Sequence, residues 1–211
     1  MNMEIALLVV SAYLIGSIST SVWISKLFFD IDIREYGSGN AGTTNTFRVL
    51  GKKPGMVVFL IDVLKGVAAT QVVHLLHSDI IVNNSLFFQI LAGIFAVLGH
   101  IFPLYTGFKG GKGVATLLGI CLGFVTVPTI VAAGVFTIVF LISGYVSLGS
   151  MTAGISFPVL VLVFFHYTAL SITIFAVTIP VLLIITHKKN IIRLIHREEN
   201  RFKIVKRRRF D

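Results

Sequence analysis

The stretch from Val114 to His187 constrains this chain most, because it contains no Lys, Arg, Asp or Glu. Over the whole sequence, 55 % of the residues are hydrophobic and only 13 % are charged. Soluble domains usually carry about 25 % charged residues. A soluble protein of this composition would have too little polar surface to stay dissolved, so much of its apolar surface must face lipid. The sequence therefore predicts an integral membrane protein.

A helix that spans a bilayer takes roughly 20 apolar residues. We therefore expect an all-α fold, a polytopic bundle of about seven transmembrane helices forming a single domain over residues 1–211. Within the charge-free stretch the divisions follow Pro128, the turn signal at residues 147–150 and the polar residues 166–168. The expected helices are Met3–Lys26, Pro54–His77, Leu86–Tyr105, Val114–Val127, Pro128–Ser147, Met151–His166 and Ala169–His187.

The basic residues predict the orientation of this bundle. With the N-terminus outside, all 18 Lys and Arg except Lys65 fall on the inner side of the membrane. This positive-inside pattern favours an odd number of spans and a cytoplasmic C-terminal tail of about residues 188–211. The formal net charge of +9 then reflects membrane topology rather than nucleic-acid binding. The basic residues 206–209 are expected to meet anionic lipid headgroups.

Three polar segments interrupt the apolar sequence, and the first is Ser38–Arg48. Its small residues allow a backbone to approach a ligand closely, and its hydroxyls and amides supply neutral hydrogen-bond donors. Arg48 can grip two oxygens of a phosphate or carboxylate. There is no acid between Tyr36 and Ile61. The segment suits an anion, although an ordinary polar loop explains its composition equally well.

The second polar segment is Phe108–Gly113, followed by apolar helix from Val114. Backbone N–H groups of a glycine-rich loop at a helix N-terminus form an anion site, and two lysines add charge. The spacing from Gly107 to Gly111 is one residue short of a Walker A loop, which excludes an ATPase on this motif. A re-entrant turn marked by lysines is the alternative interpretation.

In the third segment His187, Asn190 and Arg193 recur every three residues, so they would lie along one stripe of a helix. A polar end to the last helix explains the same pattern. Inside the second expected span, Asp62 and Lys65 are three residues apart and able to pair. Charges at that depth are costly, so we expect the pair to face the bundle interior in a supporting role.

Several absences narrow the chemistry. The single cysteine, Cys121, allows no internal disulfide, and the loops hold no paired carboxylates for magnesium. We therefore expect no metal, no cofactor and no covalent enzyme intermediate. His74 and Asp79 fit the His-x4-Asp pattern of acyltransferases that use thioesters. The predicted topology places them at the opposite membrane face, so we interpret the match as chance.

Taken together, these segments resemble the bacterial acyl-phosphate-dependent glycerol-3-phosphate acyltransferases, the PlsY family. Its three motifs appear in order: Ser38 to Arg48, then Gly99-His100 with Pro103 and Gly110–Gly113, then His187 with Asn190-Ile191 and Arg193. The resemblance implies transfer of an acyl group from acyl phosphate to glycerol 3-phosphate. The products would be lysophosphatidic acid and phosphate, at the cytoplasmic face of the bacterial inner membrane, as the first step of phospholipid synthesis.

The resemblance also implies roles for the motif residues. The phosphate of glycerol 3-phosphate is expected on Ser38, Arg48 and Lys112, with Asn190 and His187 near its glycerol end. The N–H groups of Gly110, Gly111 and Gly113 are expected to cradle the acyl phosphate. Asn40, Thr43, Thr44 and Asn45 would shape the oxyanion environment. Further substrate-binding residues are expected to be Gly39, Gly42, His100, Lys109, Thr116, Arg193, Asp62 and Lys65. The proton acceptor is either His187 or the phosphate of the acceptor substrate.

Two observations qualify this picture. The family often has a glycine ten residues after the histidine of the third motif, where this chain has Arg197, while the acid of the pattern falls at Glu199. On residue chemistry alone, a transporter or channel for a phosphorylated metabolite is the main alternative. It predicts polar residues continuing across the bundle, which the later spans lack. The partners implied are the two substrates and membrane lipids; protein partners are unknown.

Overall fold

The structure is a computed structural model, and it describes residues 3–202. Within that range the chain is helical and contains no strand, which confirms the expected all-α class. Among residues 3–202, four helical segments are long and apolar enough to cross a membrane, and the number rises to six if each of two bent helix pairs is one span. The chain divides into two compact units that meet in sequence between Phe124 and Val125. Residues 206–209, expected at lipid headgroups, lie outside the described range.

Unit 1 covers the described residues up to Phe124 and is built on two helix pairs. The first pair is α1 (Met3–Gly16) with α6 (Ser85–Ile101), and the second is α4 (Lys52–Gln71) with α7 (Val114–Phe124). A Cβ on Gly16 would collide with the Ala96 carbonyl, and one on Gly119 with the Val63 carbonyl. Glycine therefore lets the backbones of each pair touch, as is common between membrane helices.

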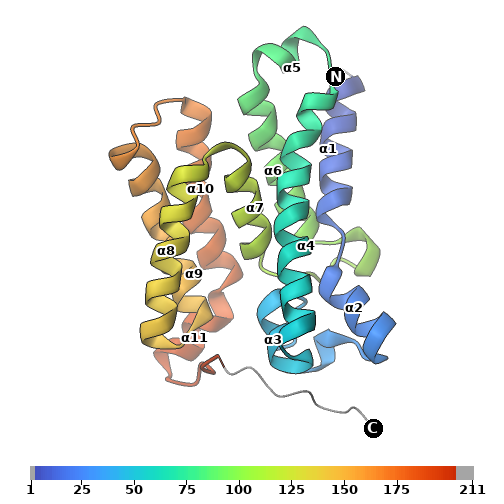
Figure 1. Cartoon of the computed structure of the whole chain (residues 1–211), viewed down its shortest axis with the longest axis vertical. Helices are drawn as coiled ribbons and strands as arrows, with labels where there is room; N and C mark the ends of the chain where they lie inside the picture. Colours follow the sequence, from blue (N-terminus) through green and yellow to red (C-terminus); the bar gives the residue numbers. More distant parts are fainter. Residues whose placement is uncertain (1–2, 203–211) are drawn as a thin grey trace. The chain divides into compact units, whose positions relative to one another are not determined.

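Shorter elements connect these helices at their two ends. They are α2 (Thr20–Phe29), η1 (Ile33–Glu35), α3 (Thr43–Leu50), η2 (Val72–Leu75), α5 (Asp79–Asn83) and η3 (Leu104–Thr106). In Figure 1, α2 and α3 lie at one end of α4, and α5 lies at the other. The first polar segment, which continues into α3, therefore lies at the end of unit 1 that is remote from α5.

The expected helix Met3–Lys26 is broken in the structure. Helix α1 ends at Gly16, α2 begins at Thr20, and the two axes differ by 42°. A break leaves backbone groups without helical partners, which is costly away from water. Here Lys65 compensates, because its Nζ donates to the Ile18 carbonyl over 2.7 Å.

Unit 2 contains α8 (Thr126–Ser143), α9 (Val146–Val159), the π-helical segment η4 (Leu160–Phe164), α10 (Leu170–Thr186) and α11 (Lys188–Ile195). The turn expected at residues 147–150 is wrong, because these residues belong to α9. The chain turns instead at Gly144, whose φ of +75° ends α8 in the left-handed conformation that glycine favours. Pro128 lies in the first turn of α8, where a missing N–H costs no helical hydrogen bond.

Candidate active site

The first polar segment is organised by the side-chain amide of Asn45. Asn45 is 2 % exposed, and its Oδ1 accepts from the Ser38 N–H over 2.8 Å. Its Nδ2 donates to the carbonyls of Ile33 over 3.0 Å and Tyr36 over 2.9 Å. Both amide N–H donors are thus committed to the backbone. Asn45 therefore shapes the loop, and its expected part in the oxyanion environment stays a prediction that it would fulfil through the backbone it orders.

In the second polar segment, the backbone N–H groups of two glycines donate to carbonyls at the end of α6. The Gly110 N–H donates to the Ile101 carbonyl and the Gly111 N–H to the His100 carbonyl, each over 3.1 Å. These bonds satisfy carbonyls at the end of α6, which would otherwise lack partners. In this conformation the N–H groups of Gly110 and Gly111 are bonded to α6, and the cradle expected of them stays a prediction. Gly113, with φ of +83°, immediately precedes α7, and its carbonyl accepts from the Leu117 N–H over 2.7 Å.

The two segments touch at Gly111. A Cβ on this glycine would lie 3.0 Å from the Ala41 carbonyl oxygen, so a side chain there would separate the loops. Ala41 immediately precedes Gly42, the N-cap of α3, and that cap makes no side-chain hydrogen bond. Helices α3 and α7 therefore both begin within a few residues of the contact between Gly111 and Ala41. Helix N-termini attract anions through their N–H groups and dipoles.

Each of these helix starts carries a threonine in its first turn. The hydroxyls of Thr43 and Thr116 are buried and have no hydrogen-bond partner within residues 3–202. Buried hydroxyls are normally satisfied, so each is available for a ligand or a water molecule. The other expected residues of the two loops lie nearer the surface. Ser38, Gly39 and Lys109 are exposed, and Asn40, Gly42, Thr44, Arg48 and Lys112 are half-buried.

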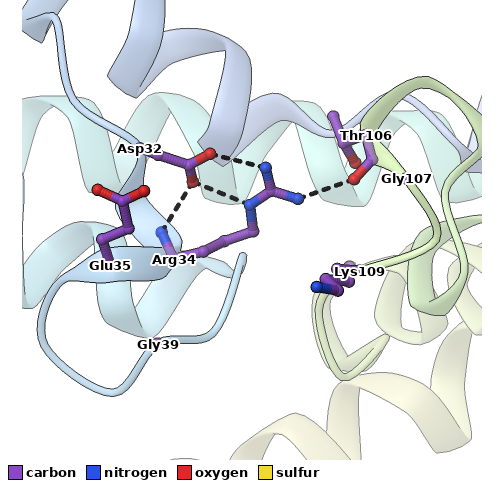
Figure 2. Close-up of a pocket in the computed structure, with 8 residues that line it drawn as sticks. Asp32, Arg34, Glu35, Gly39, Thr106, Gly107 and Lys109 are labelled. Atoms are coloured by element: carbon purple, nitrogen blue, oxygen red, sulfur yellow. Dashed lines mark hydrogen bonds and ion pairs between the residues drawn. The ribbon is translucent and has the colours of Figure 1, made fainter.

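A cavity of about 500 Å³ lies beside this meeting of loops (Figure 2). It is lined by Asp32, Arg34, Glu35, Gly39, Thr106, Gly107, Lys109 and Gly110. Figure 2 shows Arg34 bridging its two sides: its Nη2 lies 2.6 Å from Asp32 Oδ2, and its Nη1 donates to the Thr106 carbonyl over 2.8 Å. Arg34 therefore ties the second segment to the residues that precede the first.

The hydrogen bond from Arg34 to the Thr106 carbonyl was not predicted from the sequence. Residues 32–35 were assigned no role, and nothing in the local sequence indicates that Arg34 reaches Thr106. The side-chain hydrogen bond from Arg34 holds the pKa of Asp32 well below its usual range, with a smaller contribution from Lys26. The same pair raises the pKa of Arg34. Asp32 therefore remains an anion whose charge is neutralised locally.

Asp62 and Lys65 form the predicted pair inside unit 1. Lys65 Nζ lies 2.8 Å from Asp62 Oδ1, and their side chains are 3 % and 2 % exposed. The Thr20 hydroxyl donates to the same oxygen over 3.1 Å, and His100 Nδ1 lies 2.9 Å from Lys65 Nζ. The pair thus connects α2 and α4 to the end of α6.

The third polar segment lies in unit 2, where α10 and α11 meet at a bend of 64°. His187 is 2 % exposed, and its Nδ1 lies 2.9 Å from the Leu183 carbonyl. Because a carbonyl can only accept, this nitrogen carries the proton, and Nε2 carries the lone pair. In a neutral ring this geometry places the lone pair on Nε2, the tautomer that a general base requires.

Glu199 organises the rest of this segment. Its Oε1 accepts from Asn190 Nδ2 over 2.6 Å and from the Ser147 hydroxyl over 2.9 Å, and its Oε2 accepts from Arg193 Nε over 2.8 Å. Burial favours the neutral acid, but these three hydrogen bonds outweigh it and lower the pKa of Glu199. The expected alignment of Asn190 and Arg193 on one stripe is confirmed, because both reach one carboxylate.

The thioester-type pair lies elsewhere in unit 1. His74 belongs to η2 and its Nε2 lies 2.9 Å from Gln89 Nε2, while Asp79 begins α5. Figure 1 shows α5 at the end of α4 opposite α3. Among residues 3–202, no group of three His, Cys, Asp or Glu lies close enough together to hold a metal ion.

These features define a multi-pass helical membrane protein with a candidate anion site at two helix N-termini. The sequence model of the glycerol-3-phosphate acyltransferase family matches residues 6–197. A glycerol-3-phosphate acyltransferase of Bacillus subtilis (strain 168) is 46 % identical over 201 residues, which cover 95 % of this chain and 99 % of the relative. One from Streptococcus equi subsp. equi (strain 4047) is 42 % identical over 204 residues, covering 94 % and 92 %.

Two solved structures are also similar. Both are crystal structures of PlsY (YgiH), an integral membrane glycerol 3-phosphate acyltransferase. The glycerol 3-phosphate form has a TM-score of 0.85 at 38 % identity, and the match covers 95 % of this chain and 96 % of that one. The lysophosphatidic acid form has a TM-score of 0.82 at 37 % identity, with the same coverage. This chain belongs to the glycerol-3-phosphate acyltransferase family.

Proposed function

We propose that this protein transfers a fatty acyl group from acyl phosphate to glycerol 3-phosphate, giving lysophosphatidic acid and inorganic phosphate. Family membership supports the reaction, and the similar crystal structures in glycerol 3-phosphate and lysophosphatidic acid forms support the acceptor and the product. The donor is the finer part of the proposal. An acyl phosphate is already activated, so no covalent enzyme intermediate is needed.

The observation that carries this proposal is the contact between Gly111 and Ala41, which brings the starts of α3 and α7 together. Two phosphate-bearing substrates need two sources of N–H donors and positive charge. Arg48 of α3 and Lys112 before α7 supply the charge, and the threonines of the two first turns supply hydroxyls. Catalysis then rests on positioning two anions and stabilising the charge that develops.

In the proposed mechanism Ser38, Arg48 and Lys112 hold the phosphate of glycerol 3-phosphate. The acyl phosphate is held at the N-terminus of α7, with Gly113, Thr116 and Lys109. The primary hydroxyl oxygen attacks the acyl carbon and its proton passes to a base. The bond between the acyl carbon and the phosphate oxygen breaks, and the proton ends on the released phosphate.

The base is proposed to be His187, whose Nε2 carries the lone pair. Asn190 and Arg193, held by Glu199, would complete the glycerol end of the site. Replacing His187 by Ala and by Gln separates the two candidate bases. Turnover within several-fold of wild type in both variants would transfer the role of base to the acceptor's own phosphate.

The membrane topology is part of the proposal. Seven spans would arise if α7 crosses together with the four long helical segments and the two bent pairs. The distribution of Lys and Arg supports an outside N-terminus, a cytoplasmic C-terminus and an active site at the cytoplasmic face of the bacterial inner membrane. We further propose that residues 1–211 act as one catalytic domain. Cysteine labelling from each side of sealed vesicles would test the orientation.

The deciding experiment measures lysophosphatidic acid formed by purified protein in lipid, with glycerol 3-phosphate and one donor at a time. Palmitoyl phosphate, palmitoyl-CoA and palmitoyl-carrier protein are the donors. Product from palmitoyl phosphate alone, lost in Arg48→Ala, is the expected result. Product only from a thioester would mean that the donor is a thioester and that the His-x4-Asp match of His74 and Asp79 is not due to chance. If folded protein uses none of them, uptake of glycerol 3-phosphate into sealed proteoliposomes tests the transporter alternative.

A further inference from the structure

The buried ion pair of unit 1 ends on a histidine at the contact between the two loops. Lys65 Nζ has three neighbouring acceptors: the Ile18 carbonyl at 2.7 Å, Asp62 Oδ1 at 2.8 Å and His100 Nδ1 at 2.9 Å. An ammonium group has three N–H donors and no lone pair. With Asp62 as its counter-ion, Lys65 commits one donor to each acceptor.

This arrangement determines the tautomer of His100. Since Nδ1 accepts a hydrogen bond from Lys65, it carries the lone pair, and the ring proton is on Nε2. The Nε2 side of the ring faces Gly111, because a Cβ on that glycine would collide with Nε2. The Nε2–H is therefore directed toward the contact between the first and second polar segments.

At that contact residues 3–202 supply no acceptor for this donor. Among the described residues, the hydrogen bond of the His100 ring is the one that Nδ1 makes with Lys65, and Nε2 makes none. His100 is 7 % exposed, so the N–H is nearly but not fully enclosed. Because Nε2 is not fully enclosed, a water molecule or a ligand oxygen from outside the chain can serve as its acceptor.

We propose that His100 donates its Nε2–H to an oxygen of the bound acyl phosphate, and that Asp62 and Lys65 are positioning residues that hold it in this tautomer. This inference rests on the proposed function. It makes His100 a neutral donor, in addition to the cations Lys109 and Lys112. Asp62 and Lys65 stay inside the bundle and do not contact the substrate. They act on it only by holding the imidazole of His100.

Two substitutions of His100 separate this role from simple support of Lys65. In His100→Gln an amide N–H can reach the place of Nε2, whereas in His100→Asn the amide oxygen replaces Nδ1 as acceptor for Lys65. We expect His100→Gln to retain more activity than His100→Asn. We also expect His100→Asn to raise the KM for acyl phosphate more than it raises the KM for glycerol 3-phosphate. Activity of His100→Asn equal to or above that of His100→Gln would overturn the proposal.

The ion pair needs a variant that keeps the protein folded. Removing one partner would leave a buried charge, but replacing both by apolar residues is often tolerated. We expect the double variant Asp62→Leu with Lys65→Met to fold and to lose about a hundredfold in kcat/KM for acyl phosphate, as misplaced groups do. Thr70→Val, buried on the same helix outside this network, is the control and should retain wild-type activity. Unchanged kcat/KM in the folded double variant would contradict the positioning role.

A spectroscopic measurement decides the tautomer without any assay of acyl transfer. In protein labelled with ¹⁵N and ¹³C at histidine and embedded in lipid, the His100 signals are assigned from their loss in His100→Gln. We expect the Nε2–H form in wild type and loss of that preference in the double variant. A wild-type Nδ1–H form would refute the proposal even in an active enzyme. The Nε2–H form in a protein with no acyltransferase activity would instead locate the error in the proposed function.

Discussion

Glu199 Oε1 lies 2.6 Å from Asn190 Nδ2, so the residue expected to position glycerol is itself held by a carboxylate nine residues further along the chain. The same carboxylate accepts from Arg193 and Ser147, which connects α11 to the start of α9. The third motif is therefore a small hydrogen-bonded cluster rather than a set of independent side chains.

The first prediction concerns the pH dependence of this cluster. The pKa of Glu199 is lower in the folded protein than in the unfolded chain, so the unfolded chain binds more protons at acidic pH. Its contribution to stability is complete above the ordinary Glu pKa of about 4.3 and is lost as the pH falls through the lower folded value. We measure the midpoint of thermal unfolding for wild type and Glu199→Gln between pH 7 and pH 3. The difference between the two midpoints should shrink as the pH falls. A difference that does not change with pH would contradict the prediction.

The second prediction concerns Asn45. In Asn45→Asp an oxygen replaces Nδ2 opposite the Ile33 and Tyr36 carbonyls, so two donors are lost and acceptors face each other. At about 1–3 kcal/mol for each unsatisfied buried group, the first polar segment should lose its loop conformation. We expect kcat/KM to fall by more than tenfold, roughly the equivalent of 1.4 kcal/mol. Asn84→Asp, at an exposed position remote from α3, is the matched control. Equal activity of the two variants would show that the amide is dispensable.

The third prediction concerns the contact at Gly111. The φ of Gly111 lies outside the left-handed region, so Gly111→Ala is unfavourable for steric reasons alone: its Cβ would collide with the His100 ring and press on Ala41. We expect the variant to fold and to show a raised KM for acyl phosphate. In Gly134→Ala the added Cβ meets nothing within 4 Å, and a helical alanine should stabilise the protein slightly. Steady-state kinetics and thermal unfolding of both variants test the comparison.

The fourth prediction concerns Arg197, which stands where the family often has glycine. The Glu198 N–H donates to the Arg193 carbonyl and the Arg197 N–H to the Leu194 carbonyl, which is the Schellman pattern at the end of α11. Arg197 occupies its left-handed position with φ of +61°, where the family often has glycine. Arg197→Gly should therefore raise stability by up to about 1 kcal/mol, reduced by the greater freedom of unfolded glycine.

Arg197→Ala is the control, because it removes the same side chain and keeps the backbone strain. An increase in thermal unfolding midpoint for Gly but not for Ala would attribute the effect to backbone conformation. Equal midpoints in the two variants would mean that the side chain, rather than φ, governs stability at this position.

The class of protein and its three polar segments could be predicted from the amino-acid sequence. Long runs of hydrophobic residues must contact lipid, which indicates a membrane protein. The glycines, threonines and cations of the polar segments, with no acids nearby, indicated an anion site. The pairing of Asp62 with Lys65 also followed from sequence, because residues three apart on a helix are neighbours.

How the hydrogen-bond donors of those segments are used could not be predicted from the sequence, because it depends on contacts between distant segments. The amides of Gly110 and Gly111 satisfy the end of α6, and the Asn45 side chain satisfies the backbone of its own loop. The break between α1 and α2 is compensated by Lys65, 47 residues further along the chain. Spacing in a sequence shows which groups could bind a ligand. Which of them remain able to bind depends on acceptors that distant segments bring within hydrogen-bonding distance.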